Sequence, residues 1–190
     1  MFMSRCFTGG RLIMKEINAQ SPISVANFII ELANKHNLPV INLQLQKILF
    51  FVQGFSLAEY QSSLINGKFS KWQYGPIQQD VYHAFRDNGS SFIESTALDI
   101  GWDENGKIII NHSSSIDAEK IGNTQAFNEI KKFILNILHI KVWTLVQMTH
   151  SEVSWKGPKQ EIMNHSAGDY TDEEIKQCYL DNEYEISKTH

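Results

Sequence analysis

The sequence predicts a mainly α-helical protein: a single compact multi-helix domain with a small β-hairpin or short extended segments. Three observations indicate this fold class. Apolar residues recur at helical spacing in several long segments, residues typical of helix starts and stops flank them, and one isoleucine-rich region follows an Asn-Gly turn. With 190 residues, 42% of them apolar and 20% charged, the chain is long enough for one core of ordinary globular composition.

Two helices are expected in the first third of the chain. A helix is expected at residues 22–36, with Ser21 as its cap and Pro22 in its first turn, and its apolar residues fall on one face. The next helix is expected to be capped by Asn42 and is apolar on most sides, which indicates a central, buried helix. Because glycine is unfavourable inside a helix, Gly54 indicates a close contact with a neighbouring element.

The middle of the chain is expected to contain short extended segments. After a polar turn, residues 69–74 are predicted to be extended, with Trp72 and Tyr74 on one face. Pro76 is expected to start a helix that ends at Asn88-Gly89 in a left-handed cap. A β-hairpin is predicted from residues 97–102 and 107–111, joined by a turn containing Asn-Gly.

Helices are expected again in the last part of the chain. A polar linker at 113–117 precedes a long helix starting at Thr124, and a further helix covers about 144–149. Gly157-Pro158 breaks the chain before a short helical piece. Thr171 and Glu174 have the spacing of a capping box, which predicts a last helix through Tyr179.

The expected domain spans residues 21–181. Residues 1–20 are interpreted as a disordered leader, with Met14 as an alternative start, and 182–190 as a frayed tail. A targeting peptide is the rival interpretation of the leader, but it lacks an apolar run of secretory length and a small-residue cleavage signal.

Charge and cysteine content narrow the functional classes. The net charge of −4 and the pI near 6.0 make nucleic-acid binding an unfavoured hypothesis. Lys131, Lys132 and Lys141 form the best candidate for a basic patch, and a solvated helix face is the alternative. Two cysteines near opposite ends suggest no disulfide and a reducing, cytoplasmic location. The longest apolar run is too short to span a membrane.

The sequence contains no recognisable catalytic or metal-binding motif. His150, Glu152, His165 and Asp169 could supply metal ligands, but their spacing matches no recognised zinc motif, and His150 is better interpreted as a hydrogen-bonding residue at a helix end. We find no nucleophile elbow and no phosphate-binding loop. The sequence therefore predicts no catalytic residue, no metal and no cofactor.

Aromatic residues are a better indication of function. The tryptophans and tyrosines that stand out are either core residues or interface hot spots: Trp72, Tyr74, Trp102, Trp143 and Trp155.

The segments LQKILFFVQGFSLAEY (45–60) and FSKWQYGPIQQDVYHAF (69–85) resemble the Panacea domain, the SocA-like antitoxin domain of bacterial and phage toxin-antitoxin pairs. A later segment, LVQMTHSEVSW (145–155), is similar to the Thr-His segment of that family, so the resemblance spans about residues 22–180. Phe55-Ser56 departs from the Trp-His that is common in the family, and Ile77 replaces a frequent valine.

The resemblance implies a non-enzymatic antitoxin that binds and neutralises a cognate protein toxin. The toxin is expected to be encoded by a neighbouring gene. A fold alone does not name that toxin, and it leaves the oligomeric state open. Membrane binding is not expected. The family-signature or partner-binding residues that it implies are Gln46, Lys47, Gln53, Gly54, Trp72, Tyr74, Gly75, Pro76, Tyr82, His150 and Trp155. The alternatives are an adaptor that delivers a bound partner to a protease, and an enzyme that uses His150 with Glu152.

Overall fold

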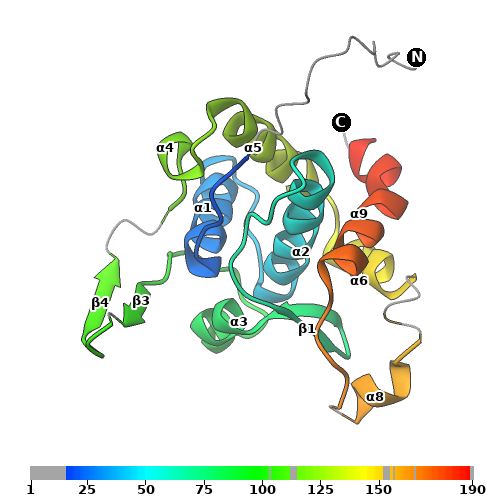
Figure 1. Ribbon diagram of the computed structural model, residues 1–190. Helices are drawn as coiled ribbons and strands as arrows, with labels where there is room; N and C mark the ends of the chain where they lie inside the picture. Colours follow the sequence, from blue (N-terminus) through cyan, green and yellow to red (C-terminus); the bar gives the residue numbers. More distant parts are fainter. Residues whose placement is uncertain are drawn as a thin grey trace.

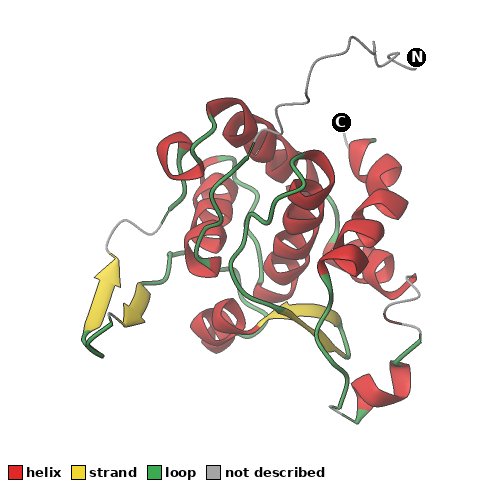
Figure 2. Cartoon of the chain, in the orientation of Figure 1, coloured by secondary structure: helices red, strands yellow, loops and turns green. Residues whose placement is uncertain are grey.

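Helix α2 (Asn42–Glu59) runs through the middle of the fold, and the other long helices surround it (Figure 1). The computed structural model describes residues 16–102, 104–111, 115–151, 155, 157–164 and 166–188. Helices α1 (Pro22–Lys35), α5 (Thr124–Leu138), α6 (Val142–Ser151) and α9 (Asp172–Ser187) all contact α2. The predicted mainly helical class is confirmed (Figure 2).

The apolar residues of α2 form the centre of the core. Six of them are fully buried, which agrees with the prediction that this helix is apolar on most sides: Leu45, Ile48, Leu49, Phe50, Phe51 and Val52. Buried residues of α1 and α5 complete the core around them. In the described part of the chain, none of the helices is long and apolar enough to cross a membrane.

Two antiparallel hairpins accompany the helices. Strands β1 (Phe69–Trp72) and β2 (Gly75–Gln78) pair beside α2, with Trp72 opposite Gly75. Strands β3 (Asp99–Trp102) and β4 (Ile108–Asn111) form the predicted second hairpin, and Gly106 in its turn has a φ of +75°. The turn residue Asp103 lies outside the described residues.

The prediction that Pro76 starts a helix is wrong. Pro76 lies inside β2, and helix α3 (Gln79–Phe85) starts only after Gln78, whose side chain accepts a hydrogen bond from the backbone of Val81. A 3-10 turn (Arg86–Asn88) follows. It ends at Gly89, whose φ of +55° is positive as expected, but whose ψ of −118° is not that of a left-handed helical cap.

Helix starts were predicted with mixed success. Ser21 caps α1 and the Thr171–Glu174 capping box opens α9, as predicted. Asn42 does not cap α2: Ile41 takes the cap position, and Asn42 is the first helical residue. The Asn42 side chain instead donates to the Tyr82 carbonyl oxygen at 3.4 Å. This bond ties the start of α2 to α3.

Short helices complete the C-terminal half. Helix α4 (Ala118–Ile121) was not predicted and is capped by Asp117, whereas α8 (Lys159–Met163) follows the break at Gly157-Pro158 as expected. Residues 112–114, in or beside the predicted linker, lie outside the described residues.

Both ends of the expected domain differ from the expectation. Within the predicted leader, Ile17 is buried and the Gln20 backbone donates to the Leu64 carbonyl at 2.7 Å, so residues 16–20 pack on the domain. Residues 1–15, including Met14, lie outside the described residues. At the other end, α9 continues past position 181 to Ser187, because Asn182 and Ile186 are buried against the rest of the fold.

Candidate protein-binding site

Helix α2 carries polar side chains into the core, and each one holds a neighbouring segment. The Gln46 side-chain oxygen accepts from the Gln78 backbone at 2.8 Å, and its amide nitrogen donates to Asn42 at 3.2 Å. The Gln53 oxygen accepts from the backbone amides of Leu64 and Ile65 at 3.0 and 2.9 Å. Because buried amides need partners, these glutamines fix the β1–β2 hairpin and the loop after α2.

Lys47 is fully buried, which is unusual for lysine. Its Nζ donates to the Pro76 carbonyl oxygen at 2.9 Å, and no carboxylate among the described residues lies within ion-pair distance of it. Burial lowers the pKa of Lys47 from 10.5 to about 7. A substantial neutral fraction is therefore present near pH 7, which removes part of the penalty of burying a charge.

The tight turn between β1 and β2 requires glycine at position 75. Gly75 has a φ of +89°, which residues with a side chain rarely adopt. A Cβ there would lie 2.5 Å from the Thr149 hydroxyl oxygen and 3.2 Å from Cε of Lys47. Side chains of α2 and α6 therefore leave no room for a Cβ at position 75, and any larger residue there would displace the turn.

His150 and Trp155 support the same turn from behind. Their rings stack with centroids 3.8 Å apart, and the Trp155 indole N–H donates to the Trp72 carbonyl oxygen at 3.2 Å. His150 also makes a hydrogen bond with the Gln73 backbone. Burial, followed by the nearby Lys47 charge, lowers the pKa of His150. A neutral imidazole is the form that suits this stacked, partly buried position.

The outer side of the turn presents aromatic rings. Trp72 meets Tyr82 edge-on at 5.0 Å, and Tyr74 meets Trp143 edge-on at 6.4 Å. Tyr74 is 52% exposed and Trp143 is 59% exposed, which is high for such large apolar side chains. Lys47, His150 and the stacked Trp155 indole therefore hold the exposed aromatic residues in place.

A pocket of about 370 Å³ opens beside these rings. We call this pocket, together with Trp143 next to Tyr74, the aromatic groove. Its lining is mainly apolar and includes one charged residue, Arg86: Asn42, Leu43, Gln46, Trp72, Gln73, Tyr74, Ile77, Tyr82, Arg86 and Gly89. A concave surface with an apolar lining and few polar groups is typical of a binding site.

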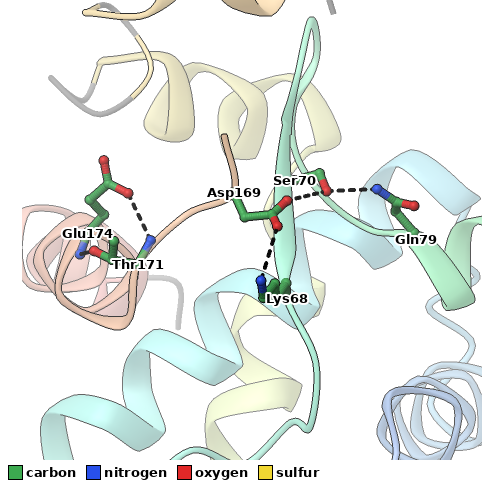
Figure 3. A network of polar contacts seen from close by, with 6 residues as sticks. All are labelled: Lys68, Ser70, Gln79, Asp169, Thr171 and Glu174. Carbon is green, nitrogen blue, oxygen red and sulfur yellow. Dashed lines mark hydrogen bonds and ion pairs between the residues drawn. The ribbon is translucent and has the colours of Figure 1, made fainter. Parts of the chain in front are cut away.

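The outer edge of β1 is closed by a polar network (Figure 3). The Ser70 hydroxyl donates to Asp169 at 2.7 Å and accepts from the Gln79 side chain at 2.9 Å, while Lys68 lies 3.9 Å from the Asp169 carboxylate. Ser70 and Asp169 also form an antiparallel bridge. This edge is covered by the chain itself, so strand addition by a partner at β1 is disfavoured.

Most of the predicted site residues lie close to the turn, but many are buried. Gln46, Lys47, Gly75, Pro76 and Trp155 are inside the protein. Trp72 and Tyr82 are half-buried, and Tyr74 is exposed. Gln53 and Gly54 lie further along α2, where a Cβ on Gly54 would be 2.6 Å from Cβ of Tyr179; this confirms the predicted close contact.

Three elements other than the first hairpin and α2 contribute Trp143, Arg86 and Tyr82 to the groove, and the first two were not predicted as site residues. Trp143 stands out in the sequence as an aromatic residue, but no sequence pattern relates it to Tyr74, because the two are far apart in the chain. The side chain of Trp102 is not among those described.

No metal centre is found in the described part of the chain, in which no three His, Cys, Asp or Glu side chains are arranged to hold an ion. Glu152 and His165, two of the four hypothetical ligands, lie outside the described residues, so the hypothesis of a site that includes them is not tested.

Comparison with known proteins decides the family. The family described as "Antitoxin SocA-like, Panacea domain" matches residues 45–156, which is more than half of the chain and includes most of α2, the first hairpin and the Thr-His segment. The chain belongs to this family. The resemblance expected from the quoted motifs is thereby confirmed.

A curated relative of this Panacea domain is "Antitoxin SocA" from Caulobacter vibrioides (strain NA1000 / CB15N). The two sequences are 37% identical over 75 residues, and the aligned part covers 40% of each chain. The Panacea domain described here thus matches that relative over less than half of the relative's length. No solved structure matches the chain.

The departure from the family pattern at Phe55-Ser56 has a structural role in this Panacea domain. The buried Ser56 hydroxyl donates to the Ser62 carbonyl oxygen at 2.6 Å, which ties the end of α2 to the following loop. Phe55 stacks on Phe133 of α5 with centroids 4.6 Å apart. Neither residue lines the aromatic groove.

Proposed function

We propose that this Panacea domain is an antitoxin that neutralises a protein toxin by direct binding, and that the aromatic groove contacts the toxin. The observation that carries the proposal is the exposed pair Tyr74 and Trp143 beside a pocket of about 370 Å³, in a member of an antitoxin family. Tryptophan, tyrosine and arginine are the residues from which interface hot spots are most often built.

The support behind the groove favours tight binding. The turn that carries Trp72 and Tyr74 is held by Lys47, by the His150–Trp155 stack and by the close packing around Gly75. Aromatic side chains that are already fixed lose little conformational entropy when a partner binds. The groove is therefore suited to a partner that docks on a preformed surface.

The residues of the family signature divide into two roles in this proposal. Trp72, Tyr74 and Tyr82 contact the toxin. The buried signature residues hold the groove and the hydrophobic core in shape without touching the toxin: Gln46, Lys47, Gln53, Gly54, Gly75, Pro76 and Trp155. His150 belongs with this second set, because its ring is stacked on Trp155.

The partner we propose is the protein encoded by the adjacent reading frame, bound in the cytoplasm without any chemical reaction on either chain. The test is co-expression of that protein with the wild-type chain and with the double variant Tyr74→Ser, Trp143→Ser. The wild-type chain is expected to restore growth and to co-purify with its partner. The variant is expected to remain folded by circular dichroism and to lose both properties.

The matched control is the double variant Leu98→Ser, Ile108→Ser, which also removes two large exposed apolar side chains but lies away from the groove. It is expected to bind and protect like the wild type. A neighbour that is harmless alone and forms no complex would refute the antitoxin function. Loss of the neighbour protein from the cell, without a stable complex, would instead support the protease-adaptor alternative.

A further inference from the structure

A second pocket, also of about 370 Å³, lies near the C-terminal end of α2, between α5 and α9. The aromatic groove contains residues from the first turns of α2, so the two pockets are at opposite ends of the central helix. We call the second one the acidic pocket. Its lining combines aromatic rings with carboxylates: Phe55, Glu59, Glu129, Lys132, Phe133, Asn136, Tyr179, Glu183, Ile186 and Ser187.

Three aromatic rings form the floor of the acidic pocket. Phe55 is half-buried and stacks on Phe133 with centroids 4.6 Å apart and an interplanar angle of 13°. Tyr179 meets both rings edge-on, at 5.9 Å from Phe55 and 5.7 Å from Phe133. Each ring is packed against the other two, so the floor is fixed before any ligand arrives.

Three glutamates line the acidic pocket beside this floor. Burial and the neighbouring Glu183 and Glu59 charges raise the pKa of Tyr179. On the other side, Glu129 accepts hydrogen bonds from the Tyr60 hydroxyl and, at 2.7 Å, from the Gln125 side chain. The lining therefore holds three carboxylates and one ammonium, that of the exposed Lys132.

We propose that the acidic pocket receives an arginine side chain of the toxin, an inference that rests on the antitoxin function proposed above. A guanidinium group stacks on aromatic rings through its plane and pairs with carboxylates through its N–H donors, so it satisfies both parts of the lining at once. The net charge of −4 also favours approach of a basic partner surface.

The first experiment uses the antitoxin chain alone. The peptide acetyl-Gly-Arg-Gly-amide is titrated into the isotopically labelled protein, and the amide resonances near Glu129, Phe133 and Tyr179 are followed by NMR. Saturable shifts are expected at millimolar peptide. The same peptide with citrulline, which has the shape of arginine but no charge, is expected to give none. Equal shifts from both peptides, or none from either, would overturn the proposal.

The second experiment uses the complex with the neighbour-encoded toxin. The variant Glu59→Gln, Glu183→Gln is expected to bind the toxin at least tenfold more weakly and with a weaker dependence on salt. The control variant Glu94→Gln, Glu104→Gln removes the same two charges from exposed positions outside the pocket and is expected to bind like the wild type.

The outcomes separate the two proposals. Unchanged toxin affinity in Glu59→Gln, Glu183→Gln overturns the arginine contact and leaves the antitoxin function standing. Equal weakening by both double variants also overturns it, because the effect would then come from net charge. If the wild-type chain forms no complex with the neighbour-encoded protein, the antitoxin function is refuted. The proposal that a toxin arginine occupies the acidic pocket is then refuted as well, even if the arginine peptide binds.

Discussion

The environment of Lys47 makes the stability of the fold depend on pH in the neutral to alkaline range. Burial lowers its pKa to about 7, whereas the unfolded chain keeps the ordinary 10.5. Between these values the unfolded state binds one more proton than the folded state, so stability rises with pH from about 7 towards 10. Tyr60 and Tyr179 act in the opposite direction above pH 10, because their pKa values are raised by burial.

We therefore predict that the free energy of unfolding increases between pH 7 and pH 9.5 by up to roughly 1.4 kcal/mol per pH unit. Urea denaturation at several pH values measures this slope. Lys47→Met, which keeps the length of the side chain and removes the titrating group, is expected to flatten it. An unchanged slope in a folded Lys47→Met variant would show that another group causes the pH dependence.

Gly75 is predicted to be far less tolerant of substitution than other glycines with positive φ. Gly75→Ala combines a φ of +89° with a Cβ 2.5 Å from the Thr149 hydroxyl oxygen, and is expected to destabilise the fold by about 2 to 4 kcal/mol. Gly106→Ala has a φ of +75° but no atom within 4 Å of the added Cβ, so about 1 kcal/mol is expected. Thermal unfolding compares them, and equal losses would contradict the role of crowding.

At the scale of elements, the contact between α2 and α9 is predicted to limit residue 54 to glycine. Helix propensity alone would make Gly54→Ala stabilising by about 1 kcal/mol. A Cβ at this position would lie 2.6 Å from Cβ of Tyr179 and 3.0 Å from the Ile175 carbonyl oxygen, so we expect a net loss of about 1 to 3 kcal/mol. Denaturant titration of Gly54→Ala shows whether the free energy of unfolding rises or falls. A more stable variant would show that α9 can move away.

The elements that the sequence predicts well are those controlled by local periodicity and caps. Helix α1, the long helix starting at Thr124 and the capping box of α9 follow from residues close together in the chain. Pro76 was misassigned because its strand depends on pairing with β1 and on the Lys47 side chain, neither of which a local pattern contains. Asn42 was misassigned because its side chain bonds to the Tyr82 carbonyl oxygen of α3 and to the Gln46 side chain, and makes no cap hydrogen bond to the backbone of α2.

The candidate site was predictable only in part, for the same physical reason. The family motifs locate the turn from Trp72 to Pro76, since those residues are contiguous. Which of them are exposed depends on residues much later in the chain: Trp143 of α6 lies outside beside Tyr74, and Trp155 lies inside beneath the turn. The acidic pocket brings together residues from three helices and has no contiguous motif at all.

At the scale of the whole molecule, α2 organises both the core and the two pockets. It contacts α1, α5, α6, α9 and β2, and its buried glutamines and lysine fix segments that carry the aromatic groove. The β3–β4 hairpin is different, because it projects from the helical body (Figure 1). Its base is tied to α1 by Asn27, whose side chain exchanges two hydrogen bonds with the backbone of Ala97, at 2.8 and 2.9 Å.

This difference predicts two levels of protection in native-state hydrogen exchange. Amides in α2 are expected to exchange only through global unfolding, because opening this helix exposes most of the core. Amides in the β3–β4 hairpin are expected to exchange through local opening, at least a hundredfold faster and with little dependence on low concentrations of urea. Hairpin amides with the same free energy of opening and the same urea dependence as α2 would contradict the prediction, and would place the hairpin within the same cooperative unit as the core.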